Sequence, residues 1–158
     1  MKGTMIDFKK MLAYSLVILS CLAFGCDDDD DDDNIVQFNN IQLRGSNEVP
    51  AVTTNGMGTL NATYNRDTNI LNYTVTWNFG NSSDNLTGMH FHGPALPTAN
   101  APVVIDITPP TTNRGAQGTV SGTTRALTEA EESELLSGRW YINVHSTTNP
   151  TGELRGQL

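Results

Sequence analysis

The stretch Leu71-Asn-Tyr-Thr-Val-Thr-Trp-Asn-Phe79 alternates apolar and polar side chains over its whole length. Successive side chains of a β-strand point to opposite faces, so this period of two predicts a strand with one buried face and one wet face. Shorter stretches repeat the pattern, and their apolar positions are Leu60, Ala62 and Tyr64; Val103, Ile105 and Ile107; and Trp140, Ile142 and Val144. Trp77 and Trp140 fall on the apolar faces, which favours packing in the core over stacking on a carbohydrate.

Two local features interrupt the alternation. Val36 and Phe38 are out of phase with Ile41 and Leu43, which predicts a β-bulge near Asn39-Asn40. Thr128-Glu-Ala-Glu131 has the pattern of a capping box, and Gly138 can end a helix, so we expect one short helix over 128–137. Short strands with a single helical connection indicate an all-β domain over 35–158, either an antiparallel β-sandwich or a partly closed Greek-key barrel.

The first 25 residues are typical of a signal peptide. Lys2, Lys9 and Lys10 precede a 14-residue apolar stretch, Met11–Phe24, which is shorter than the roughly 20 residues of a membrane-spanning helix. The stretch runs into Leu22-Ala-Phe-Gly-Cys26, which resembles a lipobox with Ala23 at the position usually held by leucine. We therefore expect cleavage after residue 25 and a lipid on Cys26. An ordinary membrane anchor or a plain secretory signal is the alternative.

Residues 26–34 combine the lipidated cysteine with seven consecutive aspartates, Asp27 to Asp33. Mutual repulsion and hydration keep such a run from packing, which favours a solvated tether. The run also resembles the acidic signals that route some lipoproteins of Gram-negative bacteria to the cell surface, and a weak cation sink is a third possibility. The expected location is the cell envelope, as an outer-membrane lipoprotein that faces the periplasm or the exterior.

Charge and cysteine content exclude some classes of function. The net charge of −8 comes mostly from the aspartate run, because Asn34–Leu158 holds six arginines and nine acidic residues. This balance of −3 offers no basic face for nucleic acid. Both cysteines lie within the first 26 residues, so the domain has no disulfide.

The chain has three histidines, and their spacing suggests a metal site. In a strand, His90 and His92 share a face, opposite Met89 and Phe91. In the stretch Arg139–His145, His145 lies on the polar face with Tyr141 and Asn143. If the two strands are neighbours, three imidazoles meet at one point and could bind copper or zinc, with water, Asp106 or nothing as the fourth ligand. The alternative is that they are surface histidines bonded to turn carbonyls.

The other charged groups do not form a catalytic set. The sequence contains no nucleophile elbow, P-loop, dinucleotide fingerprint or zinc-protease helix. We expect Glu48, Glu153 and Arg155 to pair with one another and to hold the first and last strands together, which is a structural role.

Three separated stretches together resemble the CHRD domain, a family named for its repeats in chordin and also found in bacterial secreted proteins. They are Leu43–Pro50, His90–Ala95 and Tyr141–Leu158, and the resemblance extends over about 35–158. Ala51 replaces the family's second proline after Glu-Val-Pro. The family implies a β-sandwich-like domain of poorly defined biochemical role, which favours an unknown protein or small ligand as partner.

A weaker resemblance connects the histidines with Cu/Zn superoxide dismutase. Met89-His-Phe-His92 and Gly138–His145 are similar to two histidine segments of that family, which implies copper-ligand positions for His90, His92 and His145 and an anion-guiding role for Arg155. The bridging histidine, the zinc loop and the disulfide are missing. The sequence thus favours a membrane-anchored, non-catalytic binding module, with a copper- or zinc-binding protein as the alternative and no dismutase activity expected.

Overall fold

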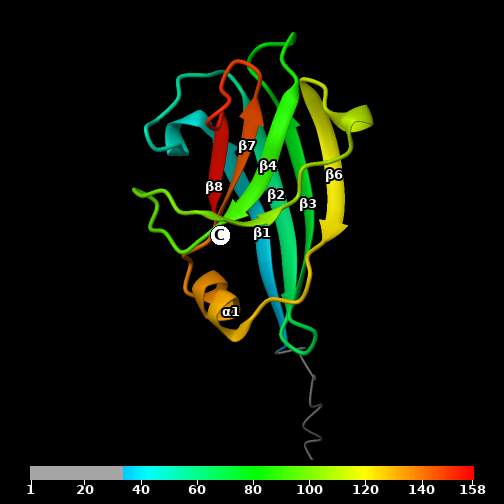
Figure 1. The fold of residues 1–158 in the computed structure, drawn as a ribbon, viewed down its shortest axis with the longest axis vertical. Coiled ribbons are helices and arrows are strands. Elements are labelled where there is room, and N and C mark those ends of the chain that lie inside the picture. Colours follow the sequence, from blue (N-terminus) through cyan, green and yellow to red (C-terminus); the bar gives the residue numbers. More distant parts are fainter. Residues whose placement is uncertain (1–33) are drawn as a thin grey trace, which may run out of the picture. The chain divides into compact units, whose positions relative to one another are not determined.

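Residues 34–158 are described by a computed structural model, which contains one curled antiparallel sheet of eight strands and one α-helix (Figure 1). The spatial order of the strands is β5-β4-β7-β8-β1-β2-β3-β6. Their bounds are β1 Ile35–Arg44, β2 Met57–Asn65, β3 Ile70–Asn78, β4 Leu86–His92, β5 Val103–Asp106, β6 Gln117–Thr123, β7 Tyr141–Ser146 and β8 Leu154–Gln157. The all-β class expected from the alternation is confirmed. The signal peptide, Cys26 and the aspartate run lie outside the described residues.

The alternation of β3 places its apolar residues in the core as predicted. Leu71, Val75 and Trp77 are buried, and Tyr73 packs edge-on against Phe91 with ring centroids 5.7 Å apart. From the other half of the sheet, β4 and β7 contribute Phe91 and Val144 to the same core. The two halves of the curled sheet therefore enclose one apolar interior.

The predicted bulge in β1 is present. The pairing of β1 with β2 shifts register between Phe38 and Ile41, and Asn40 takes a φ of 55°. Asparagine tolerates this left-handed conformation better than most residues. The backbone N–H of Asn40 donates to Asn61 Oδ1 over 2.8 Å, so the group that leaves the ladder still has a partner.

The helix α1 (Glu129–Leu136) begins at the predicted capping box. Thr128 accepts from the Glu131 backbone N–H, and the Glu131 carboxylate accepts from the Thr128 N–H. Gly138, with a φ of 71°, follows the helix. Two short 3-10 helices, η2 (Gly45–Asn47) and η3 (Thr111–Asn113), lie in the connections. In the described part of the chain, no helix has the length and apolar character to cross a membrane.

The neighbouring positions of β4 and β7 create the candidate site. Their register pairs Gly88 with His145, His90 with Asn143 and His92 with Tyr141. On the outer sides, β5 places Asp106 opposite His90, and β8 places Arg155 opposite Asn143. One row of polar residues therefore crosses four strands on the face opposite the core.

We expected this polar face to be exposed to solvent, and the structure corrects that expectation. His92 is only 8% exposed, and Asn143 and Tyr141 are also buried. The connection between β4 and β5 lies over them: Ala101 contacts both His92 and Tyr141, and Asn100 contacts Arg155. Polar strand positions can be buried when a loop covers them and supplies hydrogen-bond partners.

Candidate metal centre

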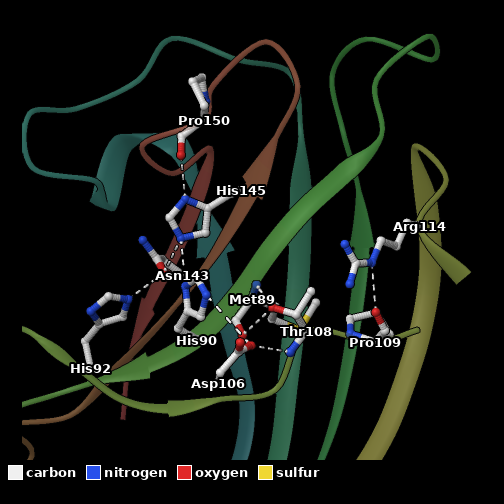
Figure 2. Close-up of polar contacts among 10 residues, drawn as sticks. All are labelled: Met89, His90, His92, Asp106, Thr108, Pro109, Arg114, Asn143, His145 and Pro150. Carbon is white, nitrogen blue, oxygen red and sulfur yellow. Dashed lines mark hydrogen bonds and ion pairs between the residues drawn. The ribbon is translucent and has the colours of Figure 1, made fainter. Parts of the chain in front are cut away.

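The three histidines meet in the folded chain although His145 is distant from the other two in sequence. One nitrogen from each of His90, His92 and His145 can be chosen so that all three lie within 4.8 Å of one another. The closest contact joins His90 Nδ1 and His145 Nε2 at 3.1 Å (Figure 2). Zn–N bonds of 2.0–2.1 Å require nitrogens about 3.3–3.6 Å apart in a three-histidine site. Movements on the order of 1 Å would complete such a site.

The second nitrogen of each ring faces an oxygen atom outside the cluster. His145 Nδ1 donates to the Pro150 carbonyl over 3.0 Å, and His92 Nδ1 donates to the Ala101 carbonyl over 2.9 Å. His90 Nε2 lies 3.8 Å from Asp106 Oδ1. Metal-binding histidines usually give their other N–H to a carbonyl or carboxylate, which fixes the tautomer and the ring orientation. His92 and His145 follow this arrangement, and the outer nitrogen of His90 faces the Asp106 carboxylate beyond hydrogen-bond distance.

Asn143 lies at the centre of the cluster. Its Oδ1 is 2.9 Å from His92 Nε2 and 2.9 Å from His145 Nε2. Because both rings use Nδ1–H for carbonyl oxygens, a neutral ring presents a lone pair at Nε2. Three electron-pair donors therefore face one another, an unfavourable set that a cation would complement.

Burial keeps two of the rings neutral. Desolvation lowers the pKa of His90, and the nearby Asp106 carboxylate opposes this only in part. Desolvation also lowers the pKa of His145, despite its bond to Pro150. A lowered pKa leaves the imidazole unprotonated at neutral pH, which is the form that binds metals.

The local sequence allows the rings to approach closely. A Cβ atom at Gly88, the cross-strand partner of His145, would lie 2.9 Å from His90 Cε1 and 3.4 Å from His145 Cδ2. A side chain here would therefore push the two rings apart. The glycine that begins the Gly-Met-His-Phe-His segment thus permits the cluster.

A stack of planar groups adjoins the cluster on the side of His92. The His92 and Tyr141 rings are parallel within 3°, with centroids 4.7 Å apart. The Arg155 guanidinium lies on the Tyr141 ring, 3.5 Å from its centroid. Cation–π contact of this kind stabilises a desolvated guanidinium.

The ion pairs expected among Glu48, Glu153 and Arg155 do not form. In residues 34–158, ion pairs join Arg66 with Glu132 and Arg125 with Glu131, while Asp106 lies beside the neutral ring of His90. Glu153 accepts from Thr54 and Ser146 instead, and Arg155 donates to Asn100 Oδ1 and to the carbonyls of Leu96 and Ala99. The first and last strands are neighbours, but only Arg44 and Arg155 pair across them. Hydroxyl donors therefore take the place of Arg155 for Glu153, and neutral oxygens of the β4–β5 connection take the place of the carboxylates for Arg155.

Sequence reasoning brought the three imidazoles together but missed the groups that orient them. Asn143 lies two residues before His145, and this spacing indicates a shared face; its central place was not foreseen. The contacts with the carbonyls of Ala101 and Pro150 could not be predicted, because every residue type has a backbone carbonyl. Asp106, considered as a fourth ligand, lies beside the outer nitrogen of His90.

The family model of the CHRD domain matches residues 40–158, which is most of the chain and nearly all of the described part. The matched range contains the three histidines, Asn143 and the loops that cover them. No curated protein and no solved structure matches the chain.

Proposed function

The chain belongs to the CHRD domain family, and we propose that its domain is a binding module that takes up one copper or zinc ion through His90, His92 and His145. One observation carries the proposal: each ring turns one nitrogen towards a common point and directs the other to an oxygen. Surface histidines bonded only to turn carbonyls would have no reason to converge.

The donor set selects the class of metal. Imidazole nitrogen suits copper and zinc, whereas calcium and magnesium prefer several oxygen ligands. Asn143 Oδ1 or a water molecule would take the fourth position. The aspartate run, in contrast, offers only oxygen, so the two regions of the chain differ in metal preference.

A binding role is favoured over catalysis by the number of histidines. The chain has three, and the proposed site uses them all. A bridging imidazole and a second metal site, as in the dismutase that the histidine segments resemble, therefore have no residues to build them. We expect the copper-loaded protein to show no superoxide dismutation once a chelator has removed free Cu²⁺.

The direct test is metal stoichiometry of the full chain, measured by elemental analysis after loading with Cu²⁺ or Zn²⁺ and removal of loosely bound ions. We expect one ion per chain. The variants His90→Ala and His145→Ala should lose at least 90% of it. Gln117→Ala, an exposed change on the edge strand β6, is the matched control and should retain the ion.

Two results would contradict the proposal. A wild-type chain that holds no tightly bound Cu²⁺ or Zn²⁺ would exclude the site. Equal metal content in wild type and His145→Ala would place the ion elsewhere, for example on the aspartate run. Circular dichroism of each variant verifies that the domain is folded.

We also propose that the chain is an exported lipoprotein of the cell envelope, held to the membrane by a lipid on Cys26. The leader, the lipobox-like segment and the cysteine-free domain support this. Cells grown with a radiolabelled fatty acid should label the wild-type chain and leave Cys26→Ala unlabelled. Equal labelling of the two chains, or no labelling of wild type, would contradict the anchor.

A further inference from the structure

A second candidate site lies beside the metal centre, where η2 and the residues after it face β8. A pocket of about 560 Å³ opens there, within the range of small-molecule sites. Its lining combines apolar surface from Val49, Pro50 and Pro97 with Glu48, Arg155 and Gln157. The pocket contains none of the three histidines, so its function can be tested independently of the metal.

Two acceptor atoms of the pocket residues lack partners. Glu48 is 8% exposed, and its Oε1 is buried without a hydrogen bond. Gln157 donates from Nε2 to the carbonyls of Ala95 and Gly138, while its Oε1 is also buried without a partner. Most buried polar atoms in folded proteins are hydrogen-bonded. Both atoms are buried, and rotation of each side chain would turn them towards a ligand that brings N–H or O–H donors.

The pocket also holds a cation that no carboxylate contacts. Arg155 is 1% exposed; its side chain donates to neutral oxygens of Asn100, Leu96 and Ala99, and its guanidinium lies on the Tyr141 ring. Glu48 is near enough to influence Arg155 electrostatically, yet the two do not form an ion pair among the described residues. Buried charges without direct counter-charges are costly. A ligand with one charge of each sign could complement both groups.

We propose that this pocket binds a small zwitterion of about dipeptide size, with its ammonium group at Glu48 and Gln157, its carboxylate at Arg155, and its apolar part on Val49, Pro50 and Pro97. An ammonium group has three donors, and a guanidinium binds carboxylates well. The net charge of a zwitterion is zero, which matches a pocket that contains one acid and one base.

The test is isothermal titration calorimetry of the full chain with L-leucyl-L-leucine. Its N-acetyl derivative removes the ammonium charge, and its C-terminal amide removes the carboxylate, so the two ends are tested without altering Arg155. We expect saturable binding of the dipeptide and affinity at least about tenfold lower for both derivatives, since each loses a charged hydrogen bond.

The matched protein variants are Glu48→Gln and Glu129→Gln. Both remove one carboxylate, but Glu129 is exposed on α1 and away from the pocket lining. Glu48→Gln should weaken dipeptide binding about tenfold or more, while Glu129→Gln should leave it unchanged. Absence of saturable binding to wild type would overturn the proposal, and so would equal affinity for the dipeptide and its N-acetyl derivative. Unchanged binding by folded Glu48→Gln would also overturn it.

Discussion

Asn143 lies between two imidazoles whose N–H groups are already committed to carbonyl oxygens. Its Oδ1 is 2.9 Å from both His92 Nε2 and His145 Nε2. Oδ1 can join the rings as a metal ligand. Rotation of the amide by 180° would instead present its NH₂ group to both lone pairs in the metal-free protein. One side chain can thus complement the cluster in either state.

The substitution Asn143→Asp should strengthen metal binding. An aspartate is nearly isosteric and places a full negative charge beside the ion, so the affinity for Zn²⁺ should rise about tenfold, a typical size for changes next to metal ligands. Asn143→Leu removes the oxygen and should lower the affinity. Competition with a chromophoric chelator measures both. Equal affinities for Asn143→Asp and wild type would show that residue 143 does not face the ion.

For single residues, the sequence predicts the strand face on which a side chain lies better than it predicts the atoms that the side chain contacts. The alternation placed His90 and His92 on one face and His145 with Asn143 on another, and strand pairing then joined the two faces. The bonds to Ala101 and Pro150 could not be predicted, because any residue type supplies a backbone carbonyl. The expected pairing of Glu153 with Arg155 was wrong because Glu153 finds hydroxyl and amide donors instead.

Among the elements, the strands follow from local patterns, whereas their order in the sheet does not. Figure 1 shows β7 beside β4, although β5, β6 and α1 lie between them in the chain. Alternation specifies which side of a strand is apolar but not which strand becomes its neighbour. The candidate site depends on that adjacency, so from the sequence it could be stated only as a condition.

The helix α1 is the element whose sequence signal and structure agree most closely. The Thr128 hydroxyl and the Glu131 carboxylate exchange hydrogen bonds with each other's backbone N–H, and Arg125 donates to both Glu131 oxygens over 2.7 Å. These contacts satisfy N–H groups that have no partner within the helix. They also place Glu131, an acidic residue, in the first turn, where the helix dipole favours it.

Removing this cap should destabilise the domain. Thr128→Ala should lower the free energy of unfolding by about 1 kcal/mol, a typical cost of losing an N-cap hydroxyl. Urea unfolding monitored by circular dichroism measures the change. Thr128→Ser keeps the hydroxyl and should stay close to wild type. An equal loss in both variants would assign the effect to packing of the threonine methyl group instead of the cap.

On the scale of the whole domain, loops turn the polar face of β4, β7 and β8 into a second interior. Asn100 and Ala101 cover it from one connection, and η2 with Glu48 covers it from another. The apolar core on the opposite face was predictable because each strand encodes it. The loops that cover the polar face were not predictable, because a surface loop and a loop folded over a polar face have similar composition.

The buried Glu48 should impose a measurable pH dependence on folding. Desolvation raises its pKa from 4.5 to about 7, and the Arg155 charge opposes this only in part. Between these values, the folded chain binds more protons at this site than the unfolded chain, so the contribution of Glu48 to stability is lost as the pH rises from 4.5 to 7. The total contribution is on the order of 3 kcal/mol.

The variant Glu48→Gln has no ionisable group at this position, so it should not lose stability in this way as the pH rises. Relative to wild type, its free energy of unfolding should therefore increase from pH 5 to pH 8 by an amount on the order of 2 kcal/mol, since part of the change lies below pH 5. Urea unfolding across this pH range measures the difference in unfolding free energy between the variant and wild type. Protonation of other groups, such as His90, contributes equally to both proteins and cancels in this difference. Gln117→Ala removes no ionisable group and should follow wild type at every pH. A Glu48→Gln profile parallel to wild type would mean that the carboxylate is already matched in the folded domain, by Arg155 or by water.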